Sequence, residues 1–361
     1  MTKMVEFKID DIEITAQEGM TILEAALEND IYIPHLCHHP DLKPVGACRL
    51  CGVEIEGRGL VMSCNTPATN DIKVKTNTKT VSETRRISLE LLLNDHHEDC
   101  LACRKNDDCE LLRISSFVGV DKERIARMRK PTELLPVDNS NPFFTFDPNK
   151  CVLCGICVRT CNEIQGRQAI DFVNRGYKTI IGSFAGEKFK DSSCESCGEC
   201  VVRCPVGALS IKNYKKPSYE VQSVCSYCGV GCQISVGVQG QKIVNINGVY
   251  GNSPNNGQLC VKGRFGSNYV NHPDRVKKPL VRQYLLDGID KPKDLGDWVE
   301  VEWDQAISIT AKKLLNLKNE FGADSIGILA SAKCTNEENY LFQKFSRQII
   351  GTHNIDHCAR L

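Results

Sequence analysis

The sequence predicts a multidomain α+β protein, and three observations support this fold class. The 361 residues are enough for two to four domains, and the chain opens with two runs of alternating apolar and charged residues, 5–9 and 12–15, as in strands. All 21 cysteines except Cys334 and Cys358 fall into five closely spaced groups before residue 261. After residue 298 the pattern changes to helix, strand and helix.

Residues 1–79 form the first predicted domain. The two alternating runs predict a hairpin, and Thr21 with Glu24 gives the capping-box pattern that begins a short helix. Residues 52–56 and 72–76 predict further strands. A small sheet with one helix is the outline of a β-grasp domain, and cysteines occupy the loops beside it.

Residues 80–120 form the second predicted domain. Thr80 and Glu83 repeat the capping-box pattern and predict the start of a longer helix. The apolar positions of this helix are Val81, Ile87, Leu91 and Leu92. We expect the helix to deliver His96 and Cys100 to one place.

Two further cysteine-rich domains follow a predicted linker. Residues 128–149 are rich in proline, Asp and Asn, which favours a linker. The third domain, residues 140–215, contains the internal repeat CVLCGICVRTC and CESCGECVVRC, and each half predicts a loop leading into a short helix. The fourth domain, residues 218–274, is rich in loops, with short strands predicted at 233–238 and 242–246.

Residues 275–361 predict the opening of a parallel α/β layer. Asp304 is the expected cap of a helix that Gly322 ends, and residues 325–330 read as a strand. A second helix is predicted over residues 336–350. An αβα order of this kind is typical of a parallel sheet with covering helices.

Bulk composition excludes several classes of protein. Lys plus Arg and Asp plus Glu both total 45, so no basic surplus is available for nucleic acid or anionic membranes. The N-terminus lacks the apolar core of a secretory signal, and no run of apolar residues is long enough to span a membrane. We expect a reducing, cytoplasmic setting, where closely spaced cysteines are metal ligands far more often than disulfides.

Each cysteine group supplies ligands of an iron–sulfur cluster, and His96 completes the one group that has three cysteines. The candidate ligands are Cys37, Cys48, Cys51 and Cys64; His96, Cys100, Cys103 and Cys109; Cys151, Cys154, Cys157 and Cys161; Cys194, Cys197, Cys200 and Cys204; and Cys225, Cys228, Cys232 and Cys260. Structural zinc sites are the alternative for the first, third and fourth groups. Cys334 and Cys358 are expected to be packed thiols.

The two halves of the repeat resemble the bacterial two-cluster ferredoxin pattern, in which the last cysteine of each run crosses to the other cluster. The resemblance implies one [4Fe-4S] cluster on Cys151, Cys154, Cys157 and Cys204. It implies a second on Cys194, Cys197, Cys200 and Cys161.

The groups that contain Cys37 and His96 resemble a different set of proteins. Ten residues separate Cys37 from Cys48, whereas four separate the first ligands in plant-type ferredoxins. The layout is similar to the N-terminal [2Fe-2S] domain shared by the respiratory complex I large subunit, iron-only hydrogenases and NAD-linked formate dehydrogenases. In the same families a [4Fe-4S] cluster ligated by one histidine and three cysteines follows. That resemblance favours His96 as the ligand, although the adjacent His97 is an alternative.

The Cys225 group, in VCSYCGVGCQ and GQLCVKGRFG, resembles the cluster domain of molybdenum and tungsten enzymes that carry two pterin guanine dinucleotides. The resemblance implies that Lys262 bridges this cluster and the proximal pterin as an electron relay. A solvated loop lysine is the alternative.

Residues 331–361 resemble the catalytic subunit of formate dehydrogenases. The resemblance implies that Asn336, Glu337, Asn339 and Tyr340 lie at the pterin dinucleotide. In that family the segment HCAR is followed one residue later by the metal-ligating selenocysteine or cysteine and then by a catalytic histidine. No catalytic residue is therefore expected within the chain: the metal ligand is expected immediately after Leu361, where a selenocysteine codon read as a stop would end the sequence.

These resemblances predict the electron-transferring portion of a molybdenum or tungsten formate dehydrogenase that interconverts formate and CO₂. One [2Fe-2S] and four [4Fe-4S] clusters would pass electrons to a partner, either a flavin-containing NAD(P)H diaphorase-type subunit, a hydrogenase subunit or a small ferredoxin. Alternative interpretations are a complex I large-subunit-like NADH dehydrogenase component and a non-catalytic polyferredoxin. Iron-only hydrogenases and nitrate reductases share only some of the motifs.

Overall fold

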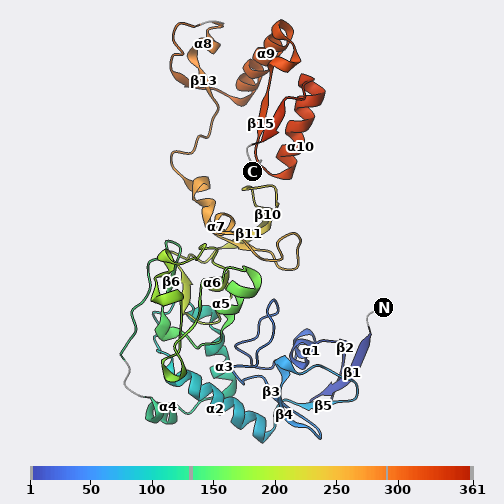
Figure 1. Ribbon diagram of the computed structural model, residues 1–361, viewed down its shortest axis with the longest axis vertical. Helices are drawn as coiled ribbons and strands as arrows, with labels where there is room; N and C mark the ends of the chain where they lie inside the picture. Colours follow the sequence, from blue (N-terminus) through green and yellow to red (C-terminus); the bar gives the residue numbers. More distant parts are fainter. Residues whose placement is uncertain (1–2, 130–132, 290–291, 358–361) are drawn as a thin grey trace. The chain divides into compact units, whose positions relative to one another are not determined.

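The computed structural model describes residues 3–129, 133–289 and 292–357 (Figure 1). The chain divides into two compact units, Met1–Asn213 and Tyr214–Leu361. No helix in the described ranges is both long and apolar enough to cross a membrane.

The first unit begins with a five-stranded sheet that has the predicted β-grasp outline. Its strands are β1 (Met4–Ile9), β2 (Ile12–Gln17), β3 (Gly52–Ile55), β4 (Gly59–Met62) and β5 (Lys73–Lys75). Their order is β2-β1-β5-β3-β4, with β1 and β5 parallel and the other neighbours antiparallel. Helix α1 (Ile22–Glu28) begins at the predicted capping box and buries Ile22 and Leu23 completely. Alternation along β1 buries one side of the strand in the same core.

Three helices follow the sheet: α2 (Lys79–Asp95), α3 (Glu110–Val118) and α4 (Lys122–Met128). The predicted cap of α2 was wrong, because Thr78 is the N-cap and its side chain accepts a hydrogen bond from the Val81 amide. The predicted apolar face was partly wrong as well. Ile87 and Leu91 are exposed, whereas Arg85 and Glu90 are buried. The polar pair can face the interior because both side chains are hydrogen-bonded there.

The repeat domain has two short strand pairs and two short helices. Its strands are β6 (Phe144–Phe146), β7 (Asp171–Val173), β8 (Ile180–Gly182) and β9 (Leu209–Ile211), with β6 antiparallel to β9 and β7 to β8. Its helices are α5 (Ile156–Arg159) and α6 (Glu199–Val202), one in each half, as predicted. Phe144 and Phe146 are buried, so the end of the predicted linker belongs to the core. The linker prediction was wrong there because proline and Asn marked turns around an unrecognised strand.

The second unit begins with three antiparallel strands, β10 (Tyr219–Val224), β11 (Gln233–Gln239) and β12 (Lys242–Gly248). The last two match the predicted strands, and β10 was not predicted. The short helix α7 (Val261–Phe265) follows directly after Cys260, which is its N-cap.

The remainder of the second unit is the predicted start of an α/β layer. Its strands are β13 (Leu280–Arg282), β14 (Trp298–Glu300), β15 (Ile328–Ala330) and β16 (Ile355–His357), and its helices are α8 (Gln283–Leu286), α9 (Trp303–Phe321) and α10 (Asn336–Lys344). A π-helical turn extends α10 to Ile350. Strands β15 and β16 are parallel, as expected for this layer. Helix α9 ends at Gly322 as predicted, but its N-cap is Glu302 rather than Asp304.

Candidate iron–sulfur cluster sites

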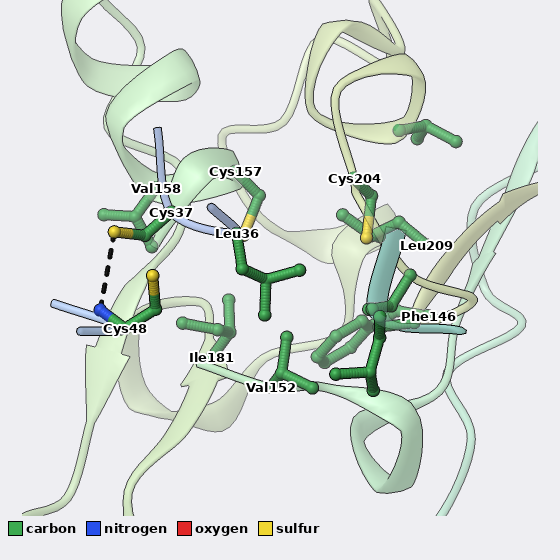
Figure 2. Close-up of a cluster of buried hydrophobic side chains, with 14 of the residues drawn as sticks. Leu36, Cys37, Cys48, Phe146, Val152, Cys157, Val158, Ile181, Cys204 and Leu209 are labelled. Carbon is green, nitrogen blue, oxygen red and sulfur yellow. Dashed lines mark hydrogen bonds between the residues drawn. The ribbon is translucent and has the colours of Figure 1, made fainter. Parts of the chain in front are cut away.

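The first candidate site lies in loops at one end of the β-grasp sheet. Cys37, Cys48, Cys51 and Cys64 are all buried, each with at most 8% of its surface exposed. Cys51 directly precedes β3, and Cys64 follows β4 in a 3₁₀ turn, so the hairpin brings these two together. The Cys48 amide lies 3.4 Å from Cys37 Sγ, and Figure 2 marks this contact.

The four thiols of this site interact in pairs. A hydrogen bond from Cys48 lowers the pKa of Cys37 to about 6, and one from Cys64 lowers the pKa of Cys51 to about 7. The same bonds raise the pKa of Cys48 and Cys64. Two thiolates are therefore favoured even before a metal binds, and thiolate is the form that ligates iron. The donor set and its shared charge fit a [2Fe-2S] cluster.

The second candidate site is a cavity at the end of α2. Its lining includes His96, Cys100, Cys103, Cys109, Lys150 and Gly207. Burial lowers the pKa of His96, and its ring also hydrogen-bonds to the backbone of Lys150. Its Nδ1 atom is buried and has no hydrogen-bond partner among the described residues. A neutral imidazole with one nitrogen held by a carbonyl and the other unpaired is the usual state of a histidine ligand.

His97 also lines this cavity but differs from His96 in burial. The His97 side chain is exposed, whereas His96 is half-buried. The His97 amide donates a hydrogen bond to the Asn149 carbonyl, 2.9 Å away, which orients this residue through its backbone. Both histidines therefore line the cavity, and His96 is the more buried of the two.

The repeat brings its eight cysteines together in two mixed groups. Burial, and then the charges of Cys154 and Cys204, raise the pKa of Cys157. Burial, and then the charges of Cys197, Cys194 and Cys161, raise the pKa of Cys200. Each half of the repeat therefore has the last cysteine of the other half as a neighbour.

A cavity marks the second of these groups. Its lining includes Cys161, Cys194, Cys197 and Cys200. In the described part of the chain, no three His, Cys, Asp or Glu side chains converge as ligands of one ion would. The thiols therefore surround a space without forming a closed coordination sphere.

The local backbone of the repeat explains why the cysteines point inward. Gly155 and Gly198 precede α5 and α6 with φ of 71° and 79°, a left-handed conformation that glycine adopts readily. Each glycine reverses the chain after a CxxC pair, so that the next cysteine enters a helix facing the same space. A Cβ at Gly155 would also meet the Phe172 ring at 3.0 Å.

The last cysteine group lies in the second unit, between β10 and α7. The Cys225 amide donates to the Cys232 carbonyl at 2.9 Å. Burial, and then the charges of Cys225, Cys228 and Cys260, raise the pKa of Cys232, so all four thiols lie close together. A Cβ at Gly263 would lie 3.7 Å from Cys225 Sγ, which shows how closely α7 approaches the group.

Lys262 and the predicted pterin-contacting residues have different surroundings. Lys262 is exposed on α7, directly before Gly263 and two residues after Cys260 in sequence. The Asn336 side chain lies against Gly229 and leaves no room there for a Cβ, so it is next to the Cys225 group. The Asn339 amide donates to the Ser331 and Thr335 carbonyls at 3.3 and 3.1 Å.

The other predicted pterin contacts are on the surface or outside the described residues. Glu337 and Tyr340 are exposed on α10. Cys334 is half-buried in the loop before this helix. Of the HCAR segment, only His357 lies within the described residues, at the end of β16, while Cys358 and Leu361 lie outside them.

Sequence analysis missed three arginines that hold the cluster loops. Arg85 on α2 is buried and donates to the Leu50 and Gly52 carbonyls at 3.1 and 2.9 Å. Arg159 and Arg203, one from each half of the repeat, reach across to the loop after Cys37. A signal was present, because each repeat carries an arginine shortly before its last cysteine.

Five domain families match the chain in sequence. Their descriptions and residues are 2Fe-2S iron-sulfur cluster binding domain, 2–79; NADH-ubiquinone oxidoreductase-G iron-sulfur binding region, 85–124; 4Fe-4S dicluster domain, 150–208; Molybdopterin oxidoreductase Fe4S4 domain, 219–272; and Molybdopterin oxidoreductase, 275–361. The predicted domain order is confirmed, together with [2Fe-2S] and [4Fe-4S] clusters as cofactors.

Curated relatives match nearly the whole chain. The NADPH-Fe(3+) oxidoreductase subunit alpha of Geobacter sulfurreducens is 37% identical over 99% of this chain and 40% of its own length. The protein named "Putative formate dehydrogenase YrhE" of Bacillus subtilis is 32% identical over 99% of this chain and 40% of its own length. A Staphylococcus aureus protein named "Putative formate dehydrogenase SAB2186c" is 29% identical over 98% of this chain and 39% of its own length. The chain thus spans about 40% of the length of these relatives.

One solved structure is also similar. A chain in the crystal structure of an NAD⁺-reducing [NiFe]-hydrogenase in the H₂-reduced state has 34% identity and a TM-score of 0.53, over 58% of this chain and 87% of that chain. The cysteine groups, the five domain families and these relatives agree. The chain belongs to the molybdopterin oxidoreductases that carry [2Fe-2S] and [4Fe-4S] domains ahead of the molybdopterin domain.

Proposed function

We propose that the chain is the electron-transferring portion of the catalytic subunit of a formate dehydrogenase. The observation that carries this proposal is the placement of five cysteine-rich groups ahead of a molybdopterin domain, in an order that relatives named as formate dehydrogenases match over 98–99% of this chain. When bound, the clusters supply one-electron steps, and a molybdenum or tungsten pterin supplies the two-electron exchange between formate and CO₂.

The proposed ligand sets follow the neighbours seen in the structure. Cys37, Cys48, Cys51 and Cys64 would hold the [2Fe-2S] cluster, and His96, Cys100, Cys103 and Cys109 a [4Fe-4S] cluster. The repeat would hold two clusters with exchanged last ligands, Cys204 and Cys161. Cys225, Cys228, Cys232 and Cys260 would hold the fifth. The exchange is supported by the cavity that Cys161 shares with Cys194, Cys197 and Cys200.

Two of the proposed cluster sites lie next to the Cys151 group in the first unit. Cys37 is among the charges that raise the pKa of Cys154, after burial and Cys204, so these two thiols are near neighbours. The His96 cavity is lined by Lys150 and Gly207, which precede Cys151 and follow Cys204 in sequence. This arrangement supports short electron transfers between the Cys151 group and both neighbours.

In the second unit, Lys262 is proposed to relay electrons between the Cys225 cluster and a pterin. Its support is its exposed position on α7, the helix that approaches Cys225. Asn336 is proposed to contact the pterin dinucleotide from beside Gly229, together with Glu337 and Tyr340 on the same helix. Asn339 is proposed to act there too, although its amide already holds the loop that carries Cys334.

The proposed partner is an electron-accepting subunit, of flavin-containing NAD(P)H diaphorase type, hydrogenase type or a ferredoxin, in the cytoplasm. The structural similarity to a chain of an NAD⁺-reducing hydrogenase supports a redox complex. A second function has its own support: a relative named NADPH-Fe(3+) oxidoreductase subunit alpha is 37% identical, against 32% for a relative named as a formate dehydrogenase. In that case electrons would enter from NADPH and leave to ferric iron.

One experiment separates the two functions. The native complex is captured anaerobically through an N-terminal tag on this chain, and two rates are measured: formate-dependent reduction of a viologen dye, and NADPH-dependent reduction of ferric citrate. Formate-dependent dye reduction with CO₂ release supports the main proposal. Ferric reduction by NADPH with no formate activity, in a complex that contains molybdenum or tungsten, would replace it with the second function.

A further inference from the structure

Arg159 connects the repeat domain to the loop of the first cysteine group. It is the last residue of α5 and lies between Cys157 and Cys161 in sequence. One guanidinium nitrogen, Nη2, donates to the Cys37 carbonyl at 2.5 Å, and the other, Nη1, donates to the Lys43 carbonyl at 2.7 Å. A single side chain therefore fixes both ends of the segment that begins with the first proposed [2Fe-2S] ligand.

The guanidinium has capacity for a further hydrogen bond. Its Nε atom is buried and has no hydrogen-bond partner within the described residues. A buried N–H that lacks a partner is costly, and such groups in native proteins usually meet a ligand, an ion or a water. The donor lies on the side chain that holds the Cys37 carbonyl.

The surroundings of Arg159 make its charge effective at this site. Figure 2 shows Cys37, Cys48 and Leu36 in the same apolar cluster as Cys157 and Val158, which are helix neighbours of Arg159. Screening by water and salt is weaker next to such a cluster than on an open surface. The hydrogen bond from Nη2 to the Cys37 carbonyl places this charge beside the residue that carries the ligand sulfur.

We propose that Arg159, although it belongs to the neighbouring domain, sets the reduction potential of the [2Fe-2S] cluster by holding the Cys37 loop and by placing a permanent positive charge beside it. The inference rests on the ligand set proposed above. Reduction adds one electron to the cluster, taken from a reduced [4Fe-4S] neighbour or from an added reductant, and no bond or proton need change. Arginine stays protonated throughout, so its charge favours the reduced, more negative state.

Loss of Arg159 should leave the cluster site able to assemble. Arg85 independently holds the loop that carries Cys48 and Cys51, through its bonds to the Leu50 and Gly52 carbonyls. Cys51 and Cys64 are buried in the β-grasp core, and Cys37 and Cys48 are buried in the apolar cluster shared with the repeat domain, so Arg159 alone does not bury the thiols. The expected effect of a substitution is therefore on potential, while the iron content stays the same.

The test is a redox titration of the whole chain, reconstituted anaerobically and followed through the [2Fe-2S] signal by electron paramagnetic resonance. Arg159→Gln removes the charge and is expected to move the one-electron equilibrium about tenfold toward the oxidised cluster, which is about 59 mV for one electron. Arg159→Lys keeps the charge and should stay within about threefold of the wild-type equilibrium. Arg167→Gln is the matched control, because Arg167 is an exposed arginine of the same domain, paired with Glu195, and should leave this potential unchanged.

The outcomes are distinguishable. An Arg159→Gln chain with a complete [2Fe-2S] signal and an unmoved potential would overturn the proposal for Arg159 alone. If Arg159→Gln does not assemble a cluster, Arg159→Lys decides whether the charge sets the potential. A tenfold shift of the one-electron equilibrium in Arg159→Lys, which retains the charge, would show that geometry rather than charge matters. A wild-type chain without any [2Fe-2S] signal would instead overturn the ligand set of the proposed function.

Discussion

Replacing Arg203 with alanine should destabilise the first unit strongly. Arg203 lies between α6 and Cys204, and its side chain is completely buried. It pairs with the equally buried Glu199 through Nη1 and with Asp41 at 2.8 Å through Nη2. Asp41 belongs to the loop after Cys37, so this charge network joins the β-grasp domain to the repeat.

The magnitude follows from burial. Removing one partner of a buried ion pair leaves the other charge without compensation, at a cost of about 3 to 5 kcal/mol in the free energy of unfolding. For a unit of this size, roughly 2 to 4 °C of melting temperature corresponds to each kcal/mol, so Arg203→Ala should lower the melting temperature by roughly 6 to 20 °C. Replacing Arg203 and Glu199 together with methionine should recover most of this loss.

The assay is thermal unfolding of the anaerobic, cluster-loaded chain, followed by visible absorbance of the clusters. Arg167→Ala is the matched control, because the Arg167–Glu195 pair is exposed, at 44% and 55% of the two side chains. An exposed ion pair contributes about 0 to 1 kcal/mol to the free energy of unfolding, so Arg167→Ala should change the melting temperature by at most about 4 °C. Equal melting temperatures for the Arg203 and Arg167 variants would refute the reasoning from burial.

Three further predictions address single residues. His96→Ala should lower iron by about four atoms per chain while His97→Ala retains it, as measured by iron analysis; loss in the second variant alone would reverse the ligand assignment. Cys161→Ser should perturb the [4Fe-4S] cluster whose other ligands are Cys194, Cys197 and Cys200, and the measurement is the signal of that cluster. A change confined to the cluster of the first half of the repeat would contradict the exchange of ligands. Thr78→Ala should cost about 1 kcal/mol in urea unfolding, whereas Thr80→Ala should cost nothing, because only Thr78 caps α2; equal losses would contradict this cap.

Spacing in sequence was enough to predict most members of each cysteine group, because cysteines two or three residues apart lie on one loop or at the start of one short helix. The short helices of the repeat and the strand β15 were predicted for the same kind of local reason. Glycine at the end of α9 also marked a boundary correctly. These features depend on residues close together in the chain.

Contacts between segments that are distant in the chain could not be predicted from the sequence. The sequence analysis named only apolar positions of α2, yet Arg85 is held by carbonyls of the Cys51 loop and Glu90 pairs with Arg124 at 3.2 Å. Ile87 and Leu91 consequently face outward. Hydrophobic periodicity cannot identify a buried face whose polar groups find partners in another domain.

The prediction of the N-cap of α2 was wrong for a more local reason. Thr80 with Glu83 matches the capping box, but Thr78 stands two residues earlier and its hydroxyl accepts from the Val81 amide at 3.2 Å. Two threonines compete for one role, and the sequence pattern does not decide between their backbone conformations.

The most direct test of the account is the iron and acid-labile sulfide content of the whole chain, purified without oxygen and reconstituted. One [2Fe-2S] and four [4Fe-4S] clusters predict about 18 iron atoms and about 18 sulfides per chain, with no bound zinc. Zinc in place of iron, or iron with almost no labile sulfide, would contradict the claim that these thiols and one imidazole hold clusters.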